Sequence, residues 1–288
     1  MEATLQPRDL GDALAARAAH PEALPLAGGT DLMVEINFDR RRPARILDLT
    51  RVRELEGWTR DGDDLVIGAG VTHARLVSEL TAPAPGLAIA ARTVGSPQIR
   101  NRGTLGGNIA TSSPAGDALP PLVAAGATVE MAASAGTRAV PLAEFCLGPR
   151  RNVLAPDELI TGVRVPVARG PQQFAKVGLR NAMVIAVCSL ALQLDPTTRT
   201  VGAAIGSAAP TVIRAPEAER FLEGALEEAD AWEGSRPLPT ALIARVGELV
   251  GAAARPVDDV RGTAAYRRHA LEVLGRRTLS WCWDEYRA

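Results

Sequence analysis

Two glycine-rich segments constrain the fold of this chain more than any other feature of its sequence. The first is Leu26–Leu32 (LAGGTDL) and the second is Gly103–Asn108 (GTLGGN). Paired glycines can adopt positive φ, and they leave the inner face of a turn free of side chains. Successive amide N–H groups can then converge on an anion such as a diphosphate. Each segment is therefore a candidate anion-binding turn.

Each segment also has an ordinary structural interpretation. The first could be a tight strand-to-helix turn capped by Thr30 or Asp31. The second could be an ordinary turn of the kind that glycine and asparagine favour, with no ligand. Neither has the G-x-x-x-x-G-K-[ST] register of a nucleoside-triphosphate loop, and neither matches G-x-G-x-x-G. Two such segments in one chain favour a long ligand held at two points. A diphosphate-bearing dinucleotide that needs no magnesium fits this pattern better than a triphosphate.

Asp117 and Lys176 are two further candidates for ligand contacts. Asp117 precedes an apolar helical stretch, so it could be a helix N-cap, an acceptor for the hydroxyls of a ribityl or ribose chain, or both. Lys176 is the single lysine among 32 lysine and arginine residues. A retained lysine indicates a place that needs a compact point charge. The alternative is that this lysine is present by chance and lies on a solvent-exposed strand without a role in binding.

Composition narrows the class of protein. With 288 residues the chain is long enough for two packed domains. Its formal net charge of −1 argues against nucleic acid or an anionic membrane as a partner. No apolar run approaches the ~20 residues of a membrane span, and the amino terminus lacks the apolar core of a signal peptide. The three cysteines and three histidines are scattered, so we expect a cytoplasmic protein that binds no metal itself.

The order of apolar patterns and turn signals predicts a chain of mixed helices and strands with two domains. Residues 1–55 read as a small β–α–β lobe, and residues 56–168 as a second lobe with more strands, including a hairpin across Ser134–Gly136. A turn-forming stretch at Ala168–Pro171 marks the boundary. Residues 172–280 form the C-terminal domain, in which strands are followed by mostly helical sequence from Pro239 to Leu279.

Five segments together resemble one family, the medium, FAD-binding subunits of molybdenum hydroxylases. Relatives include the carbon monoxide dehydrogenase flavoprotein and the central domain of xanthine dehydrogenase. The resemblance covers about residues 5–280. It implies an α+β fold, in which a two-lobed FAD-binding domain is followed by a C-terminal α+β domain with a small antiparallel sheet and helices. The matching segments are Ala27–Leu32, Ile99–Ile109, Ser113–Asp117, Lys176–Arg180 and Val260–Arg268.

The resemblance also implies which residues hold a non-covalent FAD. The first glycine segment would wrap the diphosphate, and the second would be a further diphosphate clamp. Asp117 would bond the sugar portion, Ile160 would offer backbone contacts, Lys176 would sit by the flavin ring, and Ile185 would pack near its face. The two clamps comprise Pro25, Leu26, Ala27, Gly28, Gly29, Thr30, Asp31 and Leu32, and then Thr104, Leu105, Gly106, Gly107 and Asn108.

An electron-transfer role follows from the resemblance. A large molybdopterin-binding subunit would hydroxylate the substrate at its molybdenum cofactor. A small iron–sulfur subunit would pass the electrons through two two-iron two-sulfur clusters to this FAD and on to an external acceptor. Xanthine dehydrogenase relatives carry acidic residues in the turn after the lysine, whereas residues 181–184 (NAMV) carry none, which leaves the acceptor open. The alternative is a stand-alone FAD-dependent oxidoreductase acting on a small hydroxy acid or alcohol, but the FAD motifs have no acid–base cluster beside them.

Overall fold

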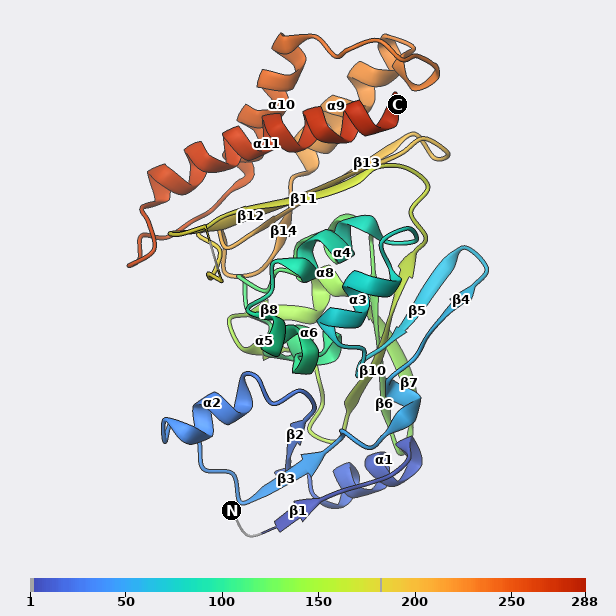
Figure 1. The fold of residues 1–288 in the computed structure, drawn as a ribbon, viewed down its shortest axis with the longest axis vertical. Coiled ribbons are helices and arrows are strands. Elements are labelled where there is room, and N and C mark those ends of the chain that lie inside the picture. Colours follow the sequence, from blue (N-terminus) through green and yellow to red (C-terminus); the bar gives the residue numbers. More distant parts are fainter. Residues whose placement is uncertain (1–2, 182) are drawn as a thin grey trace.

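The computed structural model describes residues 3–181 and 183–288, so Ala182 of the turn at 181–184 lies outside the described residues. The chain forms three parts stacked along its long axis, with the N-terminal lobe at one end and the C-terminal domain at the other (Figure 1). Helices and strands are mixed in all three parts, which confirms the predicted α+β class.

The first lobe contains the predicted β–α–β pattern as β2, α2 and β3, and a further strand β1 and helix α1 precede it. Its middle strand β3 pairs in parallel with both β1 and β2. Buried Ala13 of α1 and Leu47 of β3 lie in the small core that this lobe forms. The elements are β1 (Ala3–Leu5), α1 (Leu10–Ala19), β2 (Leu24–Leu26), α2 (Leu32–Asn37) and β3 (Arg45–Asp48).

A five-stranded antiparallel sheet is the frame of the second lobe, with strand order β4-β5-β10-β6-β7. The hairpin across Ser134–Gly136 is confirmed, since β6 and β7 pair in antiparallel register around it. Alternate side chains of β5 and β6 enter a core that three helices also line, α3 (His73–Glu79), α4 (Pro85–Arg92) and α7 (Leu119–Ala124). The strands of this sheet are β4 (Trp58–Asp61), β5 (Asp64–Gly68), β6 (Thr128–Ala133), β7 (Gly136–Pro141) and β10 (Leu159–Pro166). A separate two-stranded sheet consists of β8 (Cys146–Gly148) and β9 (Arg151–Asn152).

Short helices between β5 and β6 position the second glycine segment. Thr72 caps α3, because its hydroxyl accepts from the amide of Arg75. Ser96 and Thr104 cap α5 and α6 in the same way. The helices are α3 (His73–Glu79), α4 (Pro85–Arg92), α5 (Pro97–Arg102), α6 (Leu105–Thr111), α7 (Leu119–Ala124) and, after β7, α8 (Leu142–Phe145).

The C-terminal domain is one antiparallel sheet covered on both faces. Helices α9, α10 and α11 pack together on one side, while α4 and α7 of the second lobe lie against the other. Along β12 the faces alternate: Leu190 and Leu192 enter the core under the helices, and Ala191 enters the core of the second lobe. The elements are β11 (Gln172–Val177), β12 (Cys188–Asp195), β13 (Thr200–Gly206), β14 (Ile213–Arg214), α9 (Pro216–Glu228), α10 (Thr240–Ala253) and α11 (Ala264–Tyr286).

The change from one sheet to the next falls at the proposed domain boundary. β10 ends at Pro166 and β11 begins at Gln172.

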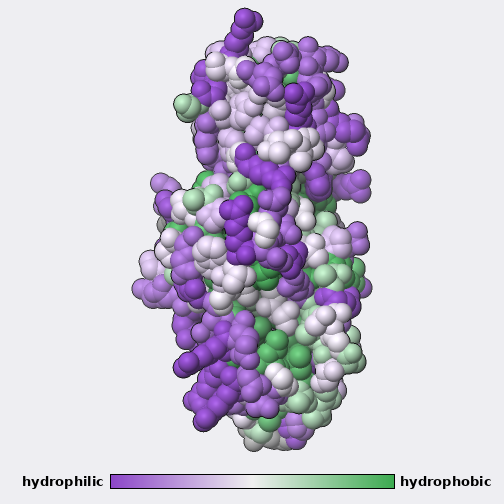
Figure 2. All heavy atoms as spheres, turned by 90° about the vertical axis from the view of Figure 1, so that its right-hand side faces the viewer, coloured by the Kyte–Doolittle hydropathy of each residue, from purple (hydrophilic) through white to green (hydrophobic). Residues whose placement is uncertain are grey.

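On the face seen in Figure 2, hydrophilic residues cover most of the C-terminal domain, while hydrophobic residues gather in patches on the parts below it. Across the described ranges, no helix combines the length and the apolar character that crossing a membrane requires.

Candidate functional site

Both glycine segments line a single cavity of about 440 Å³, although they belong to different lobes. The two backbones touch: a Cβ added to Gly28 would lie 2.6 Å from the carbonyl carbon of Arg102 and 2.9 Å from Cα of Gly103. Only a residue without a side chain allows this approach. The predicted site residues in the lining are Pro25, Leu26, Ala27, Gly28, Gly29, Thr30, Asp31, Leu32, Thr104, Gly106, Gly107, Asn108 and Ile160.

The first segment leaves its amide groups available. Gly29 has φ +74°, a left-handed conformation that suits glycine. Asp31 stands at the N-cap of α2 but makes no side-chain cap bond, so capping does not explain this turn. Within the described residues, the amides of Gly28, Gly29, Thr30 and Asp31 donate to no other protein group. Successive free N–H groups on a cavity wall fit an anionic group such as a diphosphate.

The second segment is a helix start and not the glycine turn that its sequence suggests. Helix α6 begins at Leu105, and Gly107 donates its amide to the hydroxyl of Thr104 (3.1 Å). The amides of Leu105 and Gly106 donate to carbonyl groups of the β5–α3 connection at 2.9 and 2.8 Å. The glycine at position 106 serves packing, since an added Cβ would lie 2.6 Å from the Cβ of Ala69. This segment thus offers a ligand the hydroxyl group of Thr104 and the carboxamide group of Asn108, and not a row of free backbone amides.

Leu105 contributes no side chain to the cavity. It is fully buried in the core of the second lobe and is absent from the lining. Two buried polar atoms near this segment have no hydrogen-bond partner in the described part of the chain. They are Oδ1 of Asn108 and Nδ1 of His73. Buried polar groups are normally paired, so both atoms are candidates for contact with a bound molecule.

His73 is a cavity-lining residue that the sequence did not single out. Its backbone amide donates to the carbonyl of Gly103 (3.0 Å), and its side chain is 2% exposed. Burial, and to a smaller extent the nearby charge of Arg100, lowers its pKa from 6.5 to about 4. The imidazole is therefore neutral at pH 7. The signal available in the sequence was Thr72, a residue type that favours the N-cap of a helix and directly precedes His73.

The depressed pKa of His73 predicts acid sensitivity. The unfolded chain binds a proton near pH 6.5, whereas the folded chain resists it down to about pH 4. The contribution of His73 to the free energy of unfolding is therefore fully present above pH 6.5. It is lost as the pH falls toward 4, and the loss amounts to roughly 3 kcal/mol. Urea denaturation should show that the free energy of unfolding of His73→Gln falls less over this pH range than that of the wild type. His269→Gln, at an exposed position, is the control, and equal pH slopes in all three proteins would contradict the assignment.

Asp117 and Lys176 form a buried ion pair between the two domains. The Lys176 ammonium group donates to Oδ2 of Asp117 (2.5 Å) and to the carbonyls of Thr93 (2.9 Å) and Val184 (3.1 Å). Burial raises the pKa of the Asp117 carboxyl group, and the ammonium charge opposes that rise. The side chain of Lys176 is 11% exposed, so the solvated-strand interpretation was wrong. The N-cap interpretation of Asp117 was also wrong, because Ala118 precedes α7 without a side-chain cap.

This ion pair lies beside one end of the cavity. Thr93, which accepts from Lys176, precedes Val94 of the lining. The chain at Gly116 approaches Asn108, since an added Cβ would lie 3.1 Å from its Oδ1. Asp117, Lys176 and Ile185 are not in the cavity lining themselves, and Ile185 is 54% exposed on the loop that follows β11.

A second ion pair spans the two lobes at the cavity. Glu35 of α2 is 8% exposed and accepts from Arg150, which lies between β8 and β9 in a left-handed conformation (φ +60°). Arg41 is a weaker partner of the same carboxylate at 3.5 Å. All three residues line the cavity. No signal in the sequence could have found this contact, because its partners lie on separate lobes with ordinary charged residues around them.

The residues around the cavity fit FAD. The free amides of the first segment suit a diphosphate, the orphaned polar atoms of His73 and Asn108 can pair with polar atoms of a ligand, and the interdomain ion pair stands at one end. An elongated arrangement of this kind suits a dinucleotide better than a small substrate. The side chains that could contact it are spread over both lobes and the C-terminal domain.

Comparison with known proteins agrees with this site. Residues 1–168 match the family described as the FAD binding domain in molybdopterin dehydrogenase, and residues 173–282 match the CO dehydrogenase flavoprotein C-terminal domain. The chain is 30% identical to the xanthine dehydrogenase FAD-binding subunit of Escherichia coli O157:H7, over 94% of this chain and 92% of that protein. It is also 30% identical to the carbon monoxide dehydrogenase medium chain of Afipia carboxidovorans, over 95% and 94% of the two chains.

A solved structure gives the same result. The chain superposes on carbon monoxide dehydrogenase from Hydrogenophaga pseudoflava with a TM-score of 0.86 and 28% identity, covering 98% of this chain and 97% of that one. Sequence and fold thus agree over nearly the whole length. The chain therefore belongs to the family of FAD-binding, medium subunits of molybdenum hydroxylases, which confirms the resemblance and the oxidoreductase class predicted from its sequence.

Proposed function

We propose that the cavity between the two lobes holds one FAD non-covalently, with the diphosphate at the first glycine segment and the flavin ring toward Lys176. The observation that carries this proposal is that two segments remote in sequence line one cavity, where the first leaves four successive amides free. Neither segment contains a histidine or cysteine, so a covalent flavin link there has no nucleophile.

Each predicted residue then has a distinct part in binding. Amides of Gly28–Asp31 hold the diphosphate, while the Thr104 hydroxyl and the Asn108 carboxamide bond its far side or the ribityl chain. Asp117 accepts from the sugar through its free Oδ1. The backbone of Ile160 contacts the adenosine part, and Ile185 packs near the ring. The Glu35–Arg150 pair closes the cavity across the lobes.

The chain's own residues orient the cofactor and exclude water. FAD, when bound, supplies a redox centre that exchanges electrons singly or in pairs. Lys176 already donates its three N–H groups to protein acceptors. Its charge, and not a further hydrogen bond, is what it offers to negative charge on the ring. Asp117 keeps this ammonium group in place, so the two residues act on the ring as a unit.

We further propose that this chain works as the electron-transfer subunit of a heteromeric complex. Electrons would pass from the two-iron two-sulfur clusters of a small iron–sulfur subunit to the FAD and then to an external acceptor. A large molybdopterin-binding subunit would carry the molybdenum cofactor and the substrate chemistry. The relatives that support this role are named as medium chains and FAD-binding subunits.

The stand-alone oxidoreductase remains the competing function, and the site offers it little. Direct oxidation of a hydroxy acid or alcohol requires a free acid–base group over the flavin. In the described residues, the ionisable groups at the proposed ring end, Lys176 and Asp117, are paired with each other. The buried His73 is neutral and does not gain a proton until about pH 4.

Co-expression with the two proposed partner subunits tests this function. We expect the chain to elute with the small iron–sulfur subunit in size-exclusion chromatography, because specific interfaces bury ~1,200–2,000 Å² and survive dilution. Dithionite-reduced clusters should then reduce the flavin, while the isolated chain oxidises no hydroxy acid. Turnover of a hydroxy acid by the isolated chain, without co-elution, would reverse the assignment in favour of the stand-alone enzyme.

A further inference from the structure

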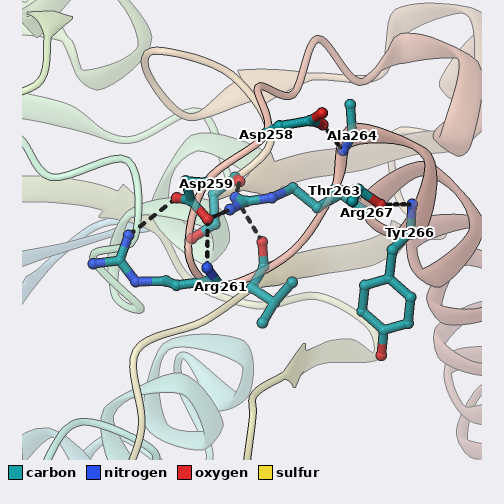
Figure 3. Close-up of polar contacts among 9 residues, drawn as sticks. Asp258, Asp259, Arg261, Thr263, Ala264, Tyr266 and Arg267 are labelled. Atoms are coloured by element: carbon teal, nitrogen blue, oxygen red, sulfur yellow. Dashed lines mark hydrogen bonds and ion pairs between the residues drawn. The ribbon is translucent and has the colours of Figure 1, made fainter.

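A buried arginine outside the cavity holds together the end of the C-terminal domain that meets the FAD-binding domain. Arg267 of α11 is 4% exposed, and the cavity lining does not include it. Its guanidinium group donates to the carbonyl of Val187 (3.0 Å), the carbonyl of Ser207 (2.5 Å) and Oδ1 of Asp259 (2.5 Å). Figure 3 shows the contact between Arg267 and Asp259 among these polar groups.

The turn before α11 is built around this arginine. Asp259 also accepts from the amide and the guanidinium group of Arg261, at 2.8 and 3.2 Å. Asp258 accepts from the amide of Ala264 (2.5 Å), and Thr263 caps the helix. The turn therefore supplies the anionic partner of Arg267, and Figure 3 shows Asp259 in contact with both Arg261 and Arg267.

The two carbonyls that Arg267 binds belong to segments next to the proposed flavin end. Ser207 follows β13 in a left-handed conformation (φ +59°), and its amide donates to the carbonyl of Pro114 (2.7 Å). Pro114 lies in the segment that leads to Asp117. Val187 closes the loop between β11 and β12, because its amide donates to the carbonyl of Val177 (2.7 Å). We call the described residues 178–181 and 183–187 the flavin-side loop.

The flavin-side loop is fixed from two sides. Lys176 binds the carbonyl of Val184 in its middle (3.1 Å), and Arg267 binds the carbonyl of Val187 at its end. A Cβ on Gly178 would meet the side chain of Val184, so the loop folds tightly back on itself. Ile185 lies between these two anchors and is the residue expected at the flavin face.

Filling space alone does not explain the guanidinium group. Burying a cation carries a large desolvation penalty, and an apolar side chain of similar volume is often the more stable choice. Here one nitrogen, Nε, has no partner in the described part of the chain, so the penalty is only partly offset. What the group provides is two donors aimed at two carbonyls in separate segments.

We infer that Arg267 is a positioning residue for the bound flavin, which fixes the flavin-side loop against the FAD-binding domain so that Ile185 and the Lys176 ammonium group keep one place at the ring. This inference rests on the proposed function, because it takes the ring to lie at Lys176. Loss of the guanidinium group then leaves two carbonyls without donors and allows the loop to adopt several positions.

The test uses the full chain reconstituted with FAD. Arg267→Met keeps a long apolar side chain, and Arg268→Met is the matched control at the next, exposed position. We expect Arg267→Met to raise the FAD dissociation constant by about tenfold and to change the visible circular dichroism of the bound flavin. The control should match the wild type in both measurements.

A purely structural role would give a different pattern. It would lower the melting temperature of Arg267→Met and leave the dissociation constant and the flavin spectrum of the folded protein unchanged, which would overturn the inference. If Arg267→Met does not fold, Asp259→Asn loosens the same guanidinium group and must show the same spectral change in smaller measure. An unchanged spectrum there would also overturn it. A wild-type chain that binds no FAD would instead refute the proposed function.

Discussion

Replacing Gly28 with valine is expected to abolish FAD binding. An added Cβ would lie 2.6 Å from the carbonyl carbon of Arg102 and 2.9 Å from Cα of Gly103, and these are backbone atoms that cannot move aside alone. The two segments must separate, which costs about 1–3 kcal/mol or more in a packed site. The cavity that both segments line is then disrupted. Flavin content after reconstitution and gel filtration is the measurement.

Gly57→Val is the matched control for that variant. Gly57 directly precedes β4, where the chain passes from the first lobe to the second. A Cβ at this position would meet no atom within 4 Å. We expect it to retain FAD and to unfold at the urea concentration of the wild type. If Gly28→Val kept a full complement of FAD, the contact between the two segments would have no part in binding.

Replacing Lys176 with methionine should destabilise the chain strongly, by about 3–5 kcal/mol at neutral pH, because it leaves a buried carboxylate without its partner. Burial already raises the pKa of Asp117, and loss of the ammonium group removes the main opposing effect. A carboxyl group with a raised folded pKa is least costly when protonated, so its penalty grows as the pH rises. The deficit of Lys176→Met should thus be smaller near pH 4–5 than near pH 8.

Urea denaturation of the FAD-free protein, with a double-mutant cycle, measures this effect. Asp117→Leu combined with Lys176→Met removes both charges, and we expect the double variant to be more stable than Lys176→Met at pH 8. The wild type and Asp117→Leu complete the cycle. The buried ion pair would be contradicted if Lys176→Met had the same free energy of unfolding as the wild type, or if its loss of stability became larger toward acid pH.

The sequence predicted local structure well where neighbouring residues decide it. The hairpin across Ser134–Gly136 follows from turn chemistry, and it is present. The sequence prediction failed at Gly106 and Gly107, where low helix propensity suggested a turn. There the Thr104 cap and the close approach of Ala69 override propensity and start a helix.

Long-range contacts were the part of the site that sequence could not supply. Asp117 and Lys176 were both selected as ligand contacts, but nothing in their spacing showed that they pair across the domain interface. The Glu35–Arg150 contact likewise depends on how the lobes pack. Such pairs are decided by tertiary structure, and a single sequence holds no direct record of them.

The identity and attachment of the flavin test the FAD site most directly. The purified full chain is reconstituted with FAD and FMN together, freed of excess flavin, and denatured with acid. Chromatography of the supernatant should show FAD alone, at one per chain, with a colourless protein pellet. FMN in the supernatant, or flavin that stays with the pellet, would contradict a non-covalent dinucleotide held by its diphosphate between the two lobes.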